Sequence, residues 1–124
     1  MNKPTIMVVD DESFICDSIK SMLANKFDVC TFLSGEIALK HLEKNHVDLI
    51  LLDYMMPDMT GYEILLKIQQ SEPQIAKIPV IFITGNTNER LEREMLNRGA
   101  TDYICKTYLK SDLTRCIDKH IKTG

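Results

Sequence analysis

The stretch IMVVDDESF, residues 6–14, places four apolar residues directly before two aspartates and a glutamate. A continuous apolar run rich in β-branched residues is typical of a strand that is covered on both faces. The carboxylates that follow it, Asp10 and Asp11, repel each other by roughly 3 kcal/mol at about 5 Å and an effective dielectric constant near 20. A positively charged partner is therefore expected at the end of this strand.

Four further strands are predicted. LILL at 49–52 and VIFI at 80–83 are as apolar as the first run, whereas FDVCTF at 27–32 and TDYIC at 101–105 are more polar, as edge strands are. Apolar residues at helical spacing predict helices over 14–24, 35–44, 61–70, 89–98 and 109–121. Ser34 is the predicted N-cap of the second helix, which Asn45 ends, and Gly99 ends the fourth.

The regular alternation of strands and helices predicts an α/β protein with a parallel sheet and helices on both faces. Right-handed crossovers leave few arrangements of such a sheet. With the three apolar strands in the centre, the strand order is 2-1-3-4-5, that of a flavodoxin-like, doubly wound, five-stranded sheet with five helices. At 124 residues, the chain is expected to form one domain over residues 1–124.

Composition excludes several classes of function. A formal net charge of −3 with scattered basic residues gives no reason to expect nucleic acid or an anionic membrane as partner. The first apolar run is too short for a secretion signal, and no run has the length of a membrane span. The four cysteines are not at CxxC spacing, and we expect them to be reduced, mostly buried thiols in a cytoplasmic protein.

In an open α/β sheet the functional site lies beyond the carboxyl ends of the strands, at the switch point between strands 1 and 3. The residues at these ends are polar: Asp10 and Asp11 after strand 1, Asp53 after strand 3, Thr84 after strand 4 and Lys106 after strand 5. Three carboxylates in an open arrangement suit Mg²⁺, which takes one or two carboxylates and retains water. A cation there offsets the repulsion between Asp10 and Asp11.

A carboxylate beside a bound Mg²⁺ can attack phosphorus and form an acyl phosphate. Asp53, at the end of the most apolar strand, is the candidate nucleophile. The phosphoryl group adds a charge of about −1.5 to −2 and three acceptor oxygens, which need donors. Lys106 supplies a compact positive charge and Thr84 a hydroxyl.

Several motifs resemble those of the response-regulator receiver domains of two-component signalling, and the likeness covers essentially the whole chain. DYMMPDMTGYE at 53–63 is similar to the family pattern D-x-x-M-P-x-x-x-G-x-E. The supporting motifs follow in the family order: VVDDE at 8–12, SGEIAL at 34–39, TG at 84–85 and GATDYICK at 99–106.

The resemblance implies that a sensor histidine kinase or a histidine phosphotransfer protein donates a phosphoryl group to Asp53. Asp10, Asp11, Asp53 and the backbone carbonyl of Met55 would hold Mg²⁺, in whose place Mn²⁺ can also serve. Catalysis of this transfer, and slow self-dephosphorylation, would be properties of the receiver itself.

The resemblance also implies a switch. Thr84 would move to bond the phosphoryl group, and Tyr103 would swing into the vacated space. The face formed by helix 89–98, strand 101–105 and helix 109–121 would change as a result, and so control an output partner or domain. A phosphorylation-dependent homodimer is compatible with this scheme.

One residue departs from the family pattern, because Thr107 stands where a proline usually follows the lysine, often with a cis peptide bond. Either the Lys106–Thr107 bond is trans with a changed loop, or it is a cis bond at a cost of about 2.5–4 kcal/mol. This departure keeps open an alternative function, a receiver-like scaffold that binds partners without phosphorylation.

Two other classes fit the residues less well. A flavin site on this fold needs a phosphate-binding loop after strand 1, where this chain has Asp-Asp-Glu. A phosphatase or mutase with an aspartyl nucleophile often has a second acid two residues later, where this chain has Met55.

Overall fold

The computed structural model describes residues 3–57, 59–85, 88–107 and 110–121. Its five strands form one parallel sheet in the order β2-β1-β3-β4-β5, which confirms the predicted fold. The strands are β1 (Thr5–Val9), β2 (Asp28–Phe32), β3 (Leu49–Asp53), β4 (Val80–Thr84) and β5 (Asp102–Cys105). Every residue of β3 and β4 is buried, whereas β2 and β5 are only partly covered, as expected of edge strands.

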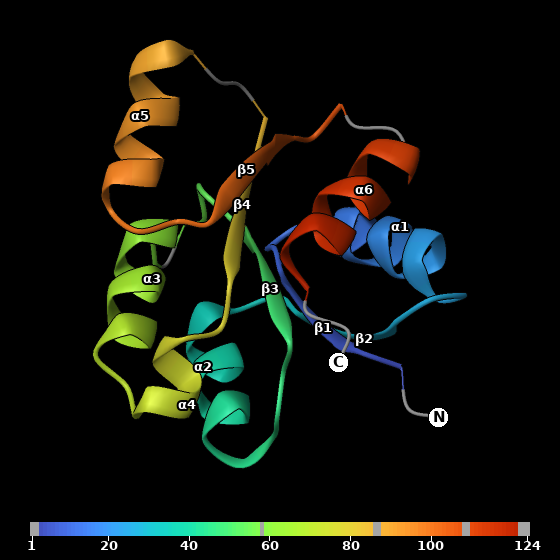
Figure 1. The fold of residues 1–124 in the computed structure, drawn as a ribbon, viewed down its shortest axis with the longest axis horizontal. Helices are drawn as coiled ribbons and strands as arrows, with labels where there is room; N and C mark the ends of the chain where they lie inside the picture. Colours follow the sequence, from blue (N-terminus) through green and yellow to red (C-terminus); the bar gives the residue numbers. More distant parts are fainter. Residues whose placement is uncertain (1–2, 58, 86–87, 108–109, 122–124) are drawn as a thin grey trace.

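Helices cover both faces of the sheet (Figure 1). They are α1 (Ser13–Leu23), α2 (Gly35–Lys44), α3 (Gly61–Gln69), α4 (Pro73–Ala76), α5 (Glu89–Asn97) and α6 (Lys110–His120). The sequence predicted all of these except α4, whose four residues are too few to show a helical period. The predicted first residue of the last helix, Leu109, lies outside the described residues.

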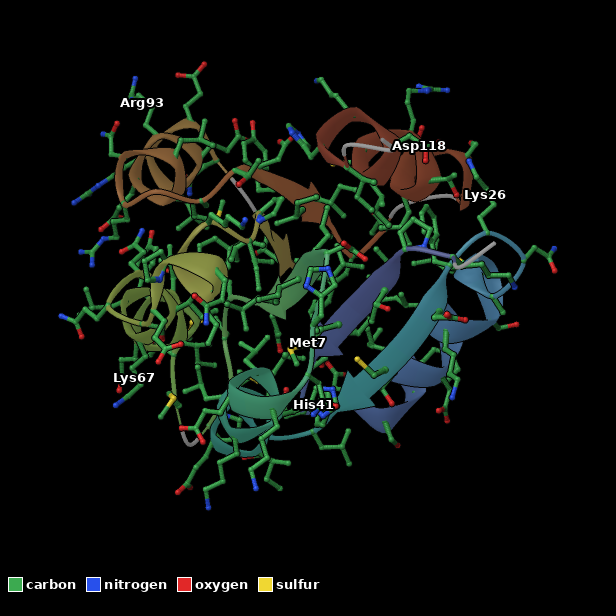
Figure 2. All side chains as sticks on the ribbon, turned by 60° about the horizontal axis from the view of Figure 1, so that its bottom comes forward. Met7, Lys26, His41, Lys67, Arg93 and Asp118 are labelled. Carbon is green, nitrogen blue, oxygen red and sulfur yellow. The ribbon has the colours of Figure 1, made fainter. Side chains whose placement is uncertain are left out.

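Each face of the sheet has its own apolar core, because successive residues of a strand point to opposite faces. On one face α1 and α6 pack through Ile19, Leu23, Leu113 and Ile117 against Ile6 and other strand residues. On the other face α2, α3 and α5 contribute side chains such as Ala38, Ile64 and Met95. Met7, in the middle of β1, lies on this second face, on the side of the sheet where the His41 ring contacts Phe32 at a tilt of 49° (Figure 2).

The predicted ends of two helices are confirmed. The Ser34 hydroxyl accepts a hydrogen bond from the Ile37 N–H, and Asn45 is the C-cap of α2. Gly99 follows the end of α5 with a φ of 107°, a left-handed conformation that side chains disfavour.

All four cysteines are free thiols, as expected, although only Cys16 is fully buried and the other three are partly exposed. Cys30 and Cys105 lie on the edge strands and Cys116 on α6, which accounts for their partial exposure. No helix in the described part of the chain is both long enough and apolar enough to cross a membrane.

Candidate functional site

The carboxyl ends of four strands meet at one edge of the sheet. Asp10 directly follows β1, Asp53 ends β3, Thr84 ends β4 and Lys106 directly follows β5. The backbone ladder continues to these residues, since the Asp10 N–H donates to the Phe32 carbonyl at 3.0 Å and the Lys106 N–H donates to the Thr84 carbonyl at 2.7 Å. The sheet therefore fixes the position of each polar residue before any side-chain contact is made.

Lys106 is the shared partner of three carboxylates. Its Nζ lies 3.3 Å from Asp10 Oδ2, 3.4 Å from Asp53 Oδ1 and 3.0 Å from Glu12 Oε1. Asp10 is 0% exposed and Asp53 is 2% exposed, so two of these three acids are out of contact with bulk water. We call Asp10, Asp11, Asp53 and Lys106 the carboxylate rim.

Two oxygens of the carboxylate rim lack a well-aligned hydrogen bond within the described residues: Oδ2 of Asp53, and Oδ2 of Asp10, which has only the 3.3 Å ion pair with Lys106. The other oxygen of each acid is occupied, because Asp10 Oδ1 accepts from the Glu12 N–H at 2.9 Å and Asp53 Oδ1 accepts from the Met55 N–H at 3.3 Å. A buried carboxylate oxygen without a donor is costly. The rim therefore has an excess of acceptors that one lysine does not satisfy.

The pKa values of the rim reflect this excess. Burial, followed by the charge of Asp10, raises the pKa of Asp53 from 3.8 to about 7, and burial also raises the pKa of Asp10. For Lys106, partial burial opposes the charged form, but the hydrogen bond to Glu12 and the charges of Asp53 and Asp10 raise its pKa. The surroundings therefore destabilise the ionised forms of Asp53 and Asp10 and stabilise the protonated form of Lys106.

The residues present fit a hard divalent cation. The buried Oδ2 atoms of Asp10 and Asp53 are the kind of ligand that Mg²⁺ binds. Asp11 is exposed at the edge, and carboxylate oxygens of Asp10, Asp11 and Glu12 lie within 4.8 Å of one another. Met55, two residues after Asp53, is 67% exposed.

The two predicted switch residues lie on neighbouring strands at different levels. Thr84 is buried at the end of β4 and pairs in register with Cys105. Tyr103 pairs with Phe82, two residues further from the edge, and packs against the core on the α5 side. A hydrogen bond with Glu92 of α5 raises the pKa of Tyr103. Tyr103 therefore connects β5 to α5 and takes no part in the carboxylate rim.

Thr107 is accommodated without a cis bond, since none occurs among the described residues. Its hydroxyl donates to the Cys105 sulfur at 3.3 Å, which holds the turn after β5. Of the two geometries left open by the sequence, the Lys106–Thr107 peptide adopts the trans form, and the lysine still reaches the rim.

Two residues near the rim were not predicted as part of the site. Glu12 holds the Lys106 ammonium, and its position directly after two aspartates was the available signal. Gly61 opens α3 beside the strand end, where a Cβ would lie 2.6 Å from Phe82 Cε1 and 2.9 Å from the Asp53 carbonyl oxygen. The glycine in the 53–63 motif is therefore explained by close packing against the backbone of Asp53.

Comparisons with known proteins agree on one family. The family model described as "Response regulator receiver domain" matches residues 6–118. A rice protein (Oryza sativa subsp. japonica), "Two-component response regulator ORR12", is 34% identical over 121 residues, which are 95% of this chain and 98% of that protein. A "Probable cyclic di-GMP phosphodiesterase" of Vibrio cholerae is 37% identical over 106 residues, but these are 86% of this chain and only 24% of that protein.

Solved structures give the same result. The chemotaxis protein CheY4 of Vibrio cholerae has a TM-score of 0.89 at 25% identity, with 96% of this chain and 99% of that chain covered. A receiver domain named DrrB, activated with BeF₃, has a TM-score of 0.83 at 29% identity, with 95% of this chain and 97% of that chain covered.

Proposed function

The chain belongs to the response regulator receiver domains, and from this membership we propose that its phosphorylation site is Asp53. A receiver domain acts in phosphorylation-dependent signalling, with a histidine kinase or phosphotransfer protein as donor and an output domain or protein as target. The proposed step transfers a phosphoryl group to a carboxylate oxygen of Asp53. The new O–P bond forms as the P–N bond to the donor histidine breaks.

The observation that carries this proposal is the excess of buried acceptors around one lysine. Oδ2 of Asp10 and Oδ2 of Asp53 lack well-aligned hydrogen bonds within the described residues, while Lys106 already contacts both acids. Asp10, Asp11, Asp53 and the carbonyl of Met55 would hold Mg²⁺ or Mn²⁺, which would neutralise charge during phosphoryl transfer. Oxygen donors alone suit these hard cations.

The chain's own residues would then stabilise the product. Lys106 lies within 3.4 Å of Asp53 Oδ1 and can donate to a phosphoryl oxygen without a long movement. Thr84, buried at the end of the neighbouring strand, supplies a hydroxyl on the same edge. Two charge-assisted hydrogen bonds of roughly 1.5–3 kcal/mol each are enough to shift an existing equilibrium between two conformations.

The signal would leave through the face formed by α5, β5 and α6. Tyr103 connects β5 to α5, so a movement of Thr84 that opens space for its ring would change this face. We place the protein in the cytoplasm, since its four cysteines are free thiols and two-component receivers act on intracellular partners.

Labelling with a small phosphodonor tests the proposal. Incubation with acetyl phosphate and Mg²⁺ is expected to add the mass of one phosphoryl group, and EDTA is expected to prevent this. Asp53→Asn should remove the mass gain, whereas the matched variant of an exposed acid, Asp28→Asn, should retain it. A folded wild-type protein that gains no mass would contradict the proposal and favour the scaffold function. A mass gain that survives Asp53→Asn would place the modified residue elsewhere.

A further inference from the structure

A second group of potential ligands lies between β5 and α6, away from the carboxylate rim. Asp102 begins β5, and Cys116 and His120 belong to the last two turns of α6 (Figure 1). His120 Nε2 lies 2.9 Å from Asp102 Oδ2, and Cys116 Sγ lies 3.6 Å from the same oxygen. The three ligand atoms all lie within 4.8 Å of one another. We call these three residues the β5–α6 cluster.

We propose that the β5–α6 cluster is a zinc site with three protein ligands and one open coordination position. Imidazole, thiolate and carboxylate are the three donors that Zn²⁺ binds in proteins, whereas Mg²⁺ selects oxygen alone. The side chains of His120 and Asp102 are 20% and 27% exposed, so the ion can enter from solvent.

The spacing of the ligand atoms supports this assignment. Ligand atoms around a tetrahedral zinc ion are separated by roughly 3.2–3.8 Å, given bond lengths of about 2.0–2.3 Å. The separations of 2.9 Å and 3.6 Å from Asp102 Oδ2 are close to that range, and the Cys116 and His120 ligand atoms lie within 4.8 Å of each other. Cys116 and His120 are four residues apart on one helix, which directs both side chains to the same face.

Charge also favours a cation at this place. A carboxylate and a thiolate together neutralise Zn²⁺, and the ligands lie at the C-terminal end of α6, where the helix dipole favours positive charge. Both the His120 ring and the Cys116 thiol converge on the single oxygen Asp102 Oδ2. One zinc ion can therefore replace two hydrogen bonds and leave Asp102 Oδ1 bonded to the Tyr103 N–H.

The β5–α6 cluster is independent of the proposed phosphorylation site. Asp102 begins β5 and Lys106 directly follows its end, so the two residues are four positions apart along the chain, or about 13 Å at ~3.3 Å per residue. The two sites also differ in donor chemistry, so Mg²⁺ can saturate the rim without filling the cluster. Zinc binding and phosphoryl transfer can thus succeed or fail separately.

Metal titration tests the proposal. The reduced, metal-free protein is titrated with Zn²⁺ in competition with a chromogenic chelator, with excess Mg²⁺ present throughout. We expect one bound zinc ion per chain, and Co²⁺ in its place is expected to give the near-ultraviolet charge-transfer absorption of a thiolate ligand. Failure of the wild-type protein to bind Zn²⁺ would overturn the proposal.

Conservative variants locate the ion. Cys116→Ser and His120→Gln retain a hydrogen-bond donor toward Asp102. Each is expected to weaken zinc binding more than about 100-fold, which exceeds the loss typical of residues that only hydrogen-bond to a metal ligand. Cys105→Ser and His46→Gln change a thiol and an imidazole outside the cluster and should bind zinc like the wild type. Wild-type zinc affinity in Cys116→Ser and His120→Gln would overturn the proposal. Urea unfolding of the metal-free variants shows whether they are folded.

Discussion

Two regions of the molecule place a shielded aspartate beside a positively charged or ionisable partner, with opposite results. In the carboxylate rim, burial raises the pKa of Asp53 to about 7. In the β5–α6 cluster, burial opposes the charged form of Asp102, but hydrogen bonds from His120 and the Tyr103 N–H lower its pKa. The same residue type is therefore destabilised as an anion in one place and stabilised in the other.

The difference lies in the ratio of acceptors to donors. At the rim, Lys106 is shared by Asp10, Asp53 and the neighbouring Glu12, and Oδ2 of Asp53 has no donor within the described residues. In the cluster both oxygens of Asp102 are bonded, Oδ1 to the Tyr103 N–H and Oδ2 to His120 and Cys116. At the rim, acceptors without donors favour the binding of an added cation or donor. In the cluster, the hydrogen bonds of Asp102 are already made and stabilise the fold.

The largest expected effect is at Asp53. Its pKa of about 7 in the folded protein lies above the ordinary 3.8, so the folded state loses stability as the pH rises from about 4 to about 7. This difference corresponds to an upper limit of roughly 4 kcal/mol. We expect Asp53→Asn to unfold at higher urea concentration than the wild type at pH 8 in EDTA, and to show little gain at pH 4.

The control for this prediction is Asp28→Asn, which changes an exposed acid at the start of β2. Its stability difference from the wild type is expected to stay within about 0.5 kcal/mol at both pH values. Mg²⁺ should reduce the advantage of Asp53→Asn, because the ion offsets the same repulsion. If Asp53→Asn gains no more stability over the wild type at pH 8 than at pH 4 without Mg²⁺, the rim is not under electrostatic stress.

The two regions also differ in how far the sequence predicts them. Strand order and the residues of the rim were predictable, because continuous apolar runs mark the central strands, and Asp10, Asp53 and Lys106 all stand at the carboxyl ends of predicted strands. The contact between Glu12 and Lys106 depends on side-chain conformations that no local pattern records. The β5–α6 cluster joins Asp102 on an edge strand to Cys116 and His120, which follow it by 14 and 18 residues in the sequence. These polar residues show no periodic pattern that would bring them together.

A smaller effect, of opposite sign, is expected in the cluster. Asp102→Asn keeps the shape of the side chain but weakens its bonds to His120 and Cys116, which should reduce the free energy of unfolding by about 1–3 kcal/mol at pH 7. The lowered pKa of Asp102 stabilises the folded protein above pH 3.8, and this contribution is lost as the pH falls through the lowered value. Urea unfolding in EDTA should therefore show a smaller deficit near pH 3.

An equal deficit at pH 7 and pH 3 would mean that the charge of Asp102 contributes nothing to stability. An increase in stability at pH 7 would mean that Asp102 is under the same stress as Asp53, and would remove the contrast between the two regions.

The smallest effect is expected where an ion pair is exposed. Lys26 Nζ lies 2.9 Å from Asp118 Oδ2 and ties the segment after α1 to α6, on the same side of the sheet as the cluster (Figure 2). The two side chains are 55% and 49% exposed, so water competes for both charges. Lys26→Ala is expected to change the free energy of unfolding by less than about 1 kcal/mol, and 0.5 M NaCl should reduce even this difference. A larger loss that persists in salt would contradict this expectation. The exposed Lys26–Asp118 pair would then stabilise the fold as much as the less exposed His120–Asp102 pair, which has the same length of 2.9 Å. Exposure to water would therefore not set the strength of ion pairs in this protein.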